Sequence, residues 1–489
     1  MHKRIAGGSI YGKLMLLVGL LVAAPLWVIW FYPEDARFAS AFLFPSCFSV
    51  FAGLMVCLYS GRGETPATEW QSPMQRGSLP VLFAWCFAFL AGAAPFVTGG
   101  LLRFHLALFE SVSGWTTTGL TVMDVTETPH IFLFHRAFMQ YCGGLGFIIM
   151  IAMLVRGKQN MSLYSAEGHP DRIQPNLKKT ARTIFILYSS FFSAGVLVYR
   201  FFGMAWFDSV CHTMSALSTA GFTTQEGSIG QYGSIPIEMV TVVLMLIGSS
   251  NFAVLLLLVK GRIVEVSRMS EVRFMVGMLL VFVPLAAFSL MRDFGLRAGD
   301  SFAKSLFGIV TTFTTTGYST MNYALWPPFA LGLLMILMII GGSAGSTAGG
   351  IKLVRAYLLI RITIENIRER LSPAQRVSIP AYHRAQGKTH IDAALIHDTV
   401  GFVFSYMVVF VVGTLLLTMT ARCGLFEAMY EFASAFGTVG ISSGLTSPDL
   451  PGAALVVLLV GMVLGRLEIF IVFVGIYSGI HMLRRAAAP

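Results

Sequence analysis

The sequence predicts an all-α polytopic membrane protein, with four pseudo-symmetric repeats around one pore and two extra N-terminal transmembrane helices. Three observations support this fold class. Of the 489 residues, 55% are hydrophobic and 12% are charged, whereas a soluble domain carries about 25% charged residues. Several apolar runs exceed the roughly 18 residues that cross a bilayer. A short motif ending in glycine recurs four times, with an apolar run on each side of every copy.

The positive charges predict the orientation in the membrane. The chain has a formal net charge of +10, but 25 of its 34 Lys and Arg residues fall in alternate inter-helix segments. These segments are 1–13, 60–78, 156–182, 260–273, 352–397 and 483–489. The positive-inside rule places them in the cytoplasm, together with both termini, and places the glycine motifs outside. The basic excess is therefore a topology signal, and we expect no nucleic-acid binding.

The N-terminal unit, residues 1–78, is predicted to hold a helix pair over 14–32 and 38–59, joined at Pro33-Glu34-Asp35, and a cytoplasmic loop. The first run follows basic residues, as in a signal peptide. Its length, the missing cleavage site and the adjoining second span favour an uncleaved anchor. The six cysteines are scattered without a CxxC pair, and we expect them to act as small hydrophobes.

Four pore repeats follow, at 79–181, 182–272, 273–397 and 398–489. Each consists of a first span, an amphipathic half-span, a glycine loop and a returning span. The first spans are expected near 79–98, 182–202, 273–291 and 399–421, the half-spans near 103–115, 206–217, 301–313 and 425–436, and the returning spans near 131–155, 235–259, 326–371 and 453–482. The half-spans are too short to cross, and non-helical backbone at membrane depth must be buried or line water. We therefore expect re-entrant half-spans and ten full spans.

The four glycine loops carry the predicted chemistry. They are Thr116-Thr117-Thr118-Gly119 (loop 1), Ser218-Thr219-Ala220-Gly221 (loop 2), Thr314-Thr315-Thr316-Gly317 (loop 3) and Gly437-Thr438-Val439-Gly440 (loop 4). No charged residue lies within them, which favours a cage of backbone carbonyls for a dehydrated monovalent cation. Glycine supplies the unusual backbone angles, and the C-terminal end of each half-span favours cations. The alternative is that these glycines only pack helices.

Polar residues outside the loops have weaker signals. Five residues beyond the four glycines stand Asp124, Glu226, Asn322 and Leu445, and the first three would attract cations at an outer mouth. Other polar residues are expected at membrane depth, each as a structural bridge between repeats; they are Lys304, Glu110, Glu431 and Asn251.

A glycine-rich segment, 341–350, interrupts the third returning span. It reads Gly341, Gly342, Ser343, Ala344, Gly345, Ser346, Thr347, Ala348, Gly349 and Gly350. The 15 preceding residues descend about 22 Å as a helix, which places the segment beneath the loops. No Gly-Lys-Ser/Thr follows, so a phosphate-binding loop is excluded. The segment is either a packing kink or an intramembrane gate with little to hold it in one conformation.

Arg466 lies inside the apolar run 453–482. An intramembrane arginine faces the bundle interior or water, and Glu468 is two residues away, on another helix face. We expect Arg466 to bind carbonyls of the segment 341–350 and to add an electrostatic barrier. The alternative is a packing charge paired with another helix.

Taken together, these motifs resemble the Trk/Ktr/HKT superfamily of cation transporters, and within it the TrkH/TrkG-type potassium uptake subunits. The resemblance covers essentially the whole chain and is carried by Trp115 with loop 1, by loop 3, by 341–347 and by 465–468. It implies K⁺ as the transported ion, a homodimer with one pore per protomer, a cytoplasmic TrkA-type nucleotide-binding partner that responds to NAD or ATP, and a bacterial inner-membrane location. It also implies a gate at 341–350 with its arginine at Arg466. No organic cofactor is expected in this chain.

The sequence leaves two alternatives to a channel-like uptake protein. A proton- or sodium-coupled symporter on the same scaffold predicts acidic or histidine residues along the pore, and no such chain of residues is evident. A membrane enzyme needs a polar cluster at one face, but the ten histidines are dispersed. Ala220 and Val439 depart from a strict threonine pattern, which matters only if hydroxyl groups, not carbonyls, bind the ion.

Overall fold

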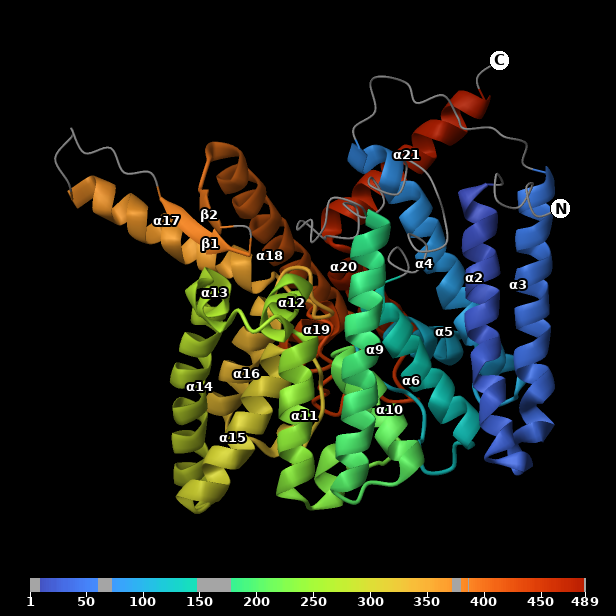
Figure 1. Ribbon diagram of the computed structural model, residues 1–489, viewed down its shortest axis with the longest axis horizontal. Helices are drawn as coiled ribbons and strands as arrows, with labels where there is room; N and C mark the ends of the chain where they lie inside the picture. The colour runs from blue at the N-terminus through green and yellow to red at the C-terminus, as the bar shows by residue number, and fades with distance from the viewer. Residues whose placement is uncertain (1–8, 60–72, 147–176, 372–379, 386, 488–489) are drawn as a thin grey trace.

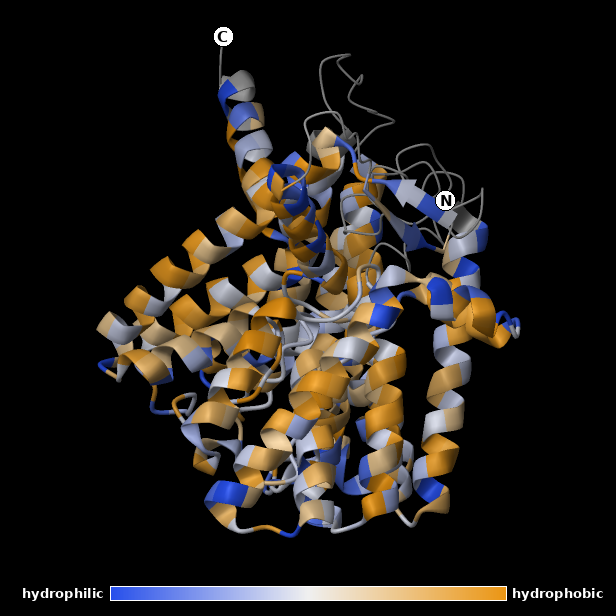
Figure 2. Ribbon diagram, turned by 90° about the vertical axis from the view of Figure 1, so that its left-hand side faces the viewer, coloured by the Kyte–Doolittle hydropathy of each residue, from blue (hydrophilic) through white to orange (hydrophobic). Residues whose placement is uncertain are grey.

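The computed structural model describes residues 9–59, 73–146, 177–371, 380–385 and 387–487. Within these ranges the protein is helical apart from one short hairpin (Figure 1). Apolar residues colour most of the length of the long helices (Figure 2). This arrangement is the predicted all-α membrane fold.

The N-terminal helix pair consists of α2 (Ile10–Ala23), extended by the 3-10 helix η1 (Ala24–Trp30), and α3 (Ala39–Tyr59), reached through η2 (Pro33–Phe38). The two helices cross closely because glycines face each other. A Cβ on Gly53 would lie 2.8 Å from the Gly12 carbonyl oxygen. Ser46 donates to the Gly19 carbonyl at 2.8 Å, so the pair is joined by packing and by a polar contact.

The remaining helices follow the predicted order. They are α4 (Pro73–Thr98), α5 (Phe104–Trp115), α6 (His130–Leu145), α9 (Leu177–Phe201), α10 (Trp206–Leu217), η3 (Ser228–Tyr232), α11 (Ile235–Gly248), α12 (Phe252–Val259), α13 (Ile263–Arg268), α14 (Ser270–Phe294), α15 (Ala298–Phe313), η4 (Tyr323–Leu325), α16 (Pro328–Ile340), α17 (Leu353–Leu371), α18 (Ala393–Ala421), α19 (Leu425–Phe436), α20 (Gly452–Leu467) and α21 (Ile469–Ala487). The expected continuation of the first returning span over 147–155 lies outside the described residues.

The returning spans differ from the expected continuous helices. In the described part of the chain, six helices are long and apolar enough to cross a membrane, or eight if two bent pairs each count as one span. The bends are 113° between α11 and α12 and 100° between α20 and α21. The continuous spans predicted over 235–259 and 453–482 are therefore wrong, and the break of the third returning span has counterparts in the second and fourth.

A small polar unit forms at one end of the molecule. Strands β1 (Ala381–Arg384) and β2 (Gly387–His390) pair antiparallel, with Ala381 opposite His390. They lie near α17 at the same end as the start of α2 and the end of α21 (Figure 1). The basic segment 352–397, which the charge pattern predicts to be cytoplasmic, thus contains a hairpin that its polar sequence did not indicate.

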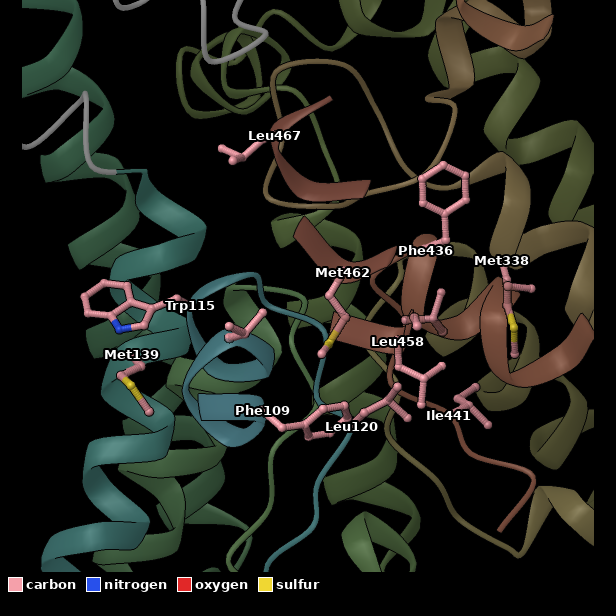
Figure 3. Close-up of a cluster of buried hydrophobic side chains, with 14 of the residues drawn as sticks. Phe109, Trp115, Leu120, Met139, Met338, Phe436, Ile441, Leu458, Met462 and Leu467 are labelled. Carbon is pink, nitrogen blue, oxygen red and sulfur yellow. The ribbon is translucent and has the colours of Figure 1, made fainter. Parts of the chain in front are cut away.

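The apolar core surrounds the short helices α5, α10, α15 and α19. Figure 3 shows Trp115 beside Met139 at one side of the view and Met338 beside Phe436 at the other. All four side chains are buried, and the Phe436 ring stacks on Tyr406 with centroids 4.0 Å apart. This packing fixes the C-terminal ends of α5 and α19, where loops 1 and 4 begin.

Candidate ion-conduction site

The four short helices end at the same point of each repeat. The C-cap residues of α5, α10, α15 and α19 are Thr116, Ser218, Thr314 and Gly437, the first residue of each glycine loop. Two backbone bonds then recur in every loop: the second loop residue donates to the carbonyl three residues earlier, and the third donates to the carbonyl five residues earlier. In loop 1 these bonds are Thr117 to Gly114 at 3.1 Å and Thr118 to Ser113 at 2.9 Å.

The backbone angles of the loops are also equivalent. The second residue of each loop has a positive φ, at Thr117 (56°), Thr219 (52°), Thr315 (56°) and Thr438 (53°). The closing glycines have φ of 91°, 73°, 86° and 86°. Threonine, which is β-branched, rarely adopts this conformation, and strain of this kind gathers at functional sites.

The loops touch one another in a closed ring. A Cβ added to each glycine would overlap a carbonyl oxygen of the next loop: Gly119 that of Ala220, Gly221 that of Thr316, Gly317 that of Val439, and Gly440 that of Thr118. The order is therefore 1, 2, 3, 4 and back to 1, with loops 1 and 3 opposite each other. In every loop the glycine is partly exposed while the three residues before it are buried. Such a ring can present backbone oxygens to a cation without any side-chain charge.

Side chains of the short helices support the loop exits. The carboxylate of Glu110 accepts from the Thr121 hydroxyl at 3.0 Å and the Val122 amide at 3.1 Å. Glu431 accepts from the Ser443 amide at 2.9 Å in the fourth repeat. Asp208, which the sequence did not single out, accepts from Thr224 at 2.6 Å in the second. These carboxylates act as acceptors for the chain that leaves loops 1, 2 and 4.

The expectation of bridges between repeats holds for some of these residues. Lys304 on α15 pairs with Glu238 on α11 at 2.9 Å, which joins the third repeat to the second. Glu110 and Glu431 bond within their own repeats, so that expectation is wrong for both. Asn251 caps α12 by accepting from the Ala253 amide at 2.8 Å.

A buried ion pair links the first two loops. Arg136 on α6 pairs with Glu110 at 2.6 Å, with both side chains almost fully buried. Its guanidinium also lies 4.0 Å from the Phe222 ring centroid and donates to the Thr223 carbonyl at 3.3 Å. A buried charge needs such complete pairing, so the first repeat holds the exit of loop 2.

Three glycines allow the returning helices to pack closely against the C-terminal ends of the short helices. A Cβ on Gly143 would overlap the carbonyl oxygen of Trp115, one on Gly248 that of Leu217, and one on Gly465 that of Phe436. In each case the carbonyl belongs to the last residue of the short helix. The spacing in the sequence is a signal for these contacts, because each of the three glycines follows its loop glycine by 24 to 27 positions.

Gly143→Ala is expected to destabilise the protein and to lower transport. Its methyl group would push α6 away from the end of α5, and overpacking of this kind costs about 1–3 kcal/mol. Thermal unfolding in detergent and ion flux in liposomes measure the two effects. Gly401→Ala in α18 is the matched control, because a Cβ there meets nothing within 4 Å. Equal stability of the two variants would contradict the close approach.

The glycine-rich segment 341–350 lies directly against the inner side of the ring. The Thr219 hydroxyl is 2.9 Å from that of Thr347, and the Gly349 amide donates to the Thr315 hydroxyl at 2.9 Å. A Cβ on Gly349 would overlap the Thr438 hydroxyl. The left-handed threonines of three loops therefore contact this segment.

Two cationic side chains reach the segment from below. Arg466 donates to the carbonyl of Thr347 and, at 2.6 Å, to that of Gly143. Lys352 donates to the carbonyl of Ala348. Glu468 instead binds Arg355 at 3.0 Å, and with a φ of 61° it forms the break between α20 and α21. Arg466 thus joins the segment to the end of α6, while Lys352 was not among the residues singled out.

The segment is held more firmly than expected. The Ser343 amide donates to the Ser249 carbonyl at 3.0 Å, at the break between α11 and α12. The Ala344 amide donates to the carboxylate of Glu271 on α14 at 2.9 Å. The Leu353 amide closes it by donating to the Gly342 carbonyl at 2.8 Å. The prediction that little holds this segment in one conformation is therefore wrong for the state described.

Glu271→Ala is expected to raise ion flux about tenfold. The substitution removes the carboxylate that accepts the Ala344 amide, and a hydrogen bond to a charged group contributes about 1.5–3 kcal/mol. Loss of this anchor favours displacement of the segment from the ring. Flux into liposomes measures the change, with Glu265→Ala, on the exposed α13 surface, as control. An unchanged flux would show that this anchor does not hold the pore closed.

The residues predicted for an outer mouth have different surroundings. Thr126 donates its hydroxyl to Asp124 at 2.6 Å and its amide at 2.8 Å, and these bonds lower the pKa of Asp124. Asn322 caps η4 through the Ala324 amide at 3.0 Å. Asp124 therefore accepts bonds from its own loop, and Asn322 caps a short helix.

Comparisons with known proteins identify the family. The model of the TrkH family, described as a cation transport protein, matches residues 48–477. The Trk system potassium uptake protein TrkG of Escherichia coli K12 is 30% identical over 96% of both chains. TrkH of Vibrio parahaemolyticus is 31% identical over 94% of this chain and 96% of its own. The crystal structure of the potassium transporter TrkH from Vibrio parahaemolyticus superposes with a TM-score of 0.83 and 28% identity over 97% of this chain and 98% of that one. The chain therefore belongs to the TrkH family of cation transport proteins.

Proposed function

We propose that this chain takes up K⁺ across a bacterial inner membrane through one channel-like pore. The observation that carries the proposal is the closed ring of four equivalent loops, each beginning at the C-terminal end of a short helix. The ring binds the ion through backbone oxygens of 116–119, 218–221, 314–317 and 437–440. The partial negative charge of the four helix ends adds to the attraction. The relatives named as potassium uptake proteins support K⁺ as the ion.

The segment 341–350 and Arg466 form the gate in this proposal. The segment occupies the space beneath the ring, and Arg466 and Lys352 add positive charge there. Opening requires the segment to move away from Thr219, Thr315 and Thr438. The returning spans of the second and fourth repeats break near the same contacts, so the gate is supported by several repeats.

The organisation of the chain follows from the same proposal. The four pore repeats are 79–181, 182–272, 273–397 and 398–489, after the N-terminal unit 1–78. Both termini and the hairpin face the cytoplasm, in keeping with the basic segments of the sequence. The functional unit is a homodimer with a TrkA-type nucleotide-binding partner at the cytoplasmic side, since the relatives belong to a named Trk system.

Ion flux through the purified protein in liposomes tests the function. We expect K⁺ to enter down its own gradient, with Na⁺ flux at least tenfold lower, and no dependence on a pH or Na⁺ gradient. Flux that requires a proton or sodium gradient would favour the coupled symporter instead.

A further inference from the structure

The four loops share a backbone but differ in the residue before the glycine. Loops 1 and 3 have threonine there, and these hydroxyls pair with the first residue of the loop: Thr118 with Thr116 at 2.8 Å, and Thr316 with Thr314 at 2.8 Å. The Thr116 hydroxyl also donates to the Val112 carbonyl at 2.7 Å, so in that pair Thr118 is the donor. The hydroxyl pair thus ties the residue before the glycine to the end of the short helix.

Loop 2 cannot form this pair, because Ala220 has no hydroxyl. A glutamine from the neighbouring repeat takes its place. Gln140 on α6 donates its Nε2 to the Ala220 carbonyl at 2.8 Å, and its Oε1 accepts the Phe222 amide at 3.2 Å. One carboxamide therefore bonds the backbone on both sides of Gly221, and its side chain is fully buried.

A second contact supports the same surface of α6. Residues four apart lie on one helix face, and Arg136 is four residues before Gln140. Its guanidinium covers the Phe222 ring and donates to the Thr223 carbonyl. Two successive turns of α6 therefore hold the residues that follow Gly221, where φ is 73° and the glycine itself offers no side chain to fix the backbone.

We propose that Gln140 is a specificity-determining positioning residue, which holds loop 2 in the geometry that the hydroxyl pairs impose on loops 1 and 3. This inference rests on the proposed potassium filter. Selection between K⁺ and Na⁺ depends on the number and placement of the coordinating oxygens, and the Ala220 carbonyl belongs to the contact between loops 1 and 2. In this proposal Gln140 does not bind the ion; it positions the backbone of loop 2, whose oxygens do.

Gln140→Leu and Gln140→Met test the proposal in liposomes that report K⁺ and Na⁺ flux separately. Both substitutions remove the donor to the Ala220 carbonyl, and the second keeps the size of the side chain. We expect each to lower the K⁺/Na⁺ flux ratio about tenfold while K⁺ flux persists. Gln231→Leu is the control, because this exposed glutamine contacts the Gly227 amide, away from loop 2.

Restoration distinguishes this role from general packing. Adding Ala220→Thr to Gln140→Leu supplies a hydroxyl that can donate to Ser218, as Thr118 does to Thr116, and we expect the flux ratio to recover. An unchanged ratio in the folded Gln140→Met variant overturns the proposal, and so does a lost ratio that Ala220→Thr leaves unrestored. Failure of the unsubstituted protein to prefer K⁺ would instead overturn the filter on which the proposal rests.

Discussion

Replacing Gly317 by alanine is expected to abolish the preference for K⁺ and to lower its uptake at least tenfold. Gly317 has a φ of 86°, and a Cβ there would overlap the Val439 carbonyl oxygen of the next loop. An L-residue in this left-handed region costs roughly 1–2 kcal/mol before any clash. The overlap lies within the ring, so relief requires loops 3 and 4 to separate and displaces the oxygens that would bind the ion.

The matched control for Gly317→Ala is Gly332→Ala. Gly332 lies in α16 of the same repeat, and a Cβ there meets nothing within 4 Å. Fluxes of K⁺ and Na⁺ into liposomes compare the two variants, with thermal unfolding in detergent to show that both are folded. If Gly317→Ala kept the flux and the preference of the unsubstituted protein, the ring would not be the filter.

Replacing Arg466 by alanine is expected to raise K⁺ flux at least tenfold in the absence of a partner protein. The guanidinium joins Thr347 beneath the ring to Gly143 at the end of α6. At an effective dielectric constant of 20, two like unit charges 4 Å apart repel by about 4 kcal/mol. The substitution therefore removes both a mechanical tie and an electrostatic barrier for a cation leaving the ring.

Arg466→Lys separates these two contributions. Lysine keeps the positive charge but lacks the planar fork that reaches two carbonyls, so we expect an intermediate flux. Arg262→Ala is the surface control, since the Arg262 side chain is 59% exposed. Unchanged flux and gating in Arg466→Ala would leave this residue a packing role only.

The sequence was sufficient to predict the short helices and the loops. The predicted starts and ends of the half-spans agree with α5, α10 and α19 within two residues, and α15 begins three residues earlier. Local signals explain this success: an amphipathic run of limited length, a glycine that permits a positive φ, and a hydroxyl-rich segment between them. The position of Arg466 within an apolar run also predicted polar partners for it, because a charge at that depth must be paired or hydrogen-bonded.

The breaks of the returning helices were beyond local sequence reasoning. Glu468 adopts a φ of 61°, although glutamate is not one of the residues that commonly end a helix in this conformation. Its carboxylate binds Arg355 on α17, 113 residues away. The contacts of Gln140 likewise join α6 to loop 2 of the neighbouring repeat. Such contacts depend on how repeats are arranged in space, so the periodicity of one helix cannot report them.

Anomalous scattering from crystals grown in Rb⁺ or Tl⁺ tests the carbonyl ring most directly, because these heavy ions resemble K⁺ and can be located without reference to the protein density. We predict a peak on the axis of the ring, between the glycines at 119, 221, 317 and 440, that added K⁺ displaces and the same concentration of Na⁺ leaves in place. A protein that transports K⁺ but whose heavy ion binds at carboxylates such as Asp124, with no peak within the ring, would contradict the proposed filter.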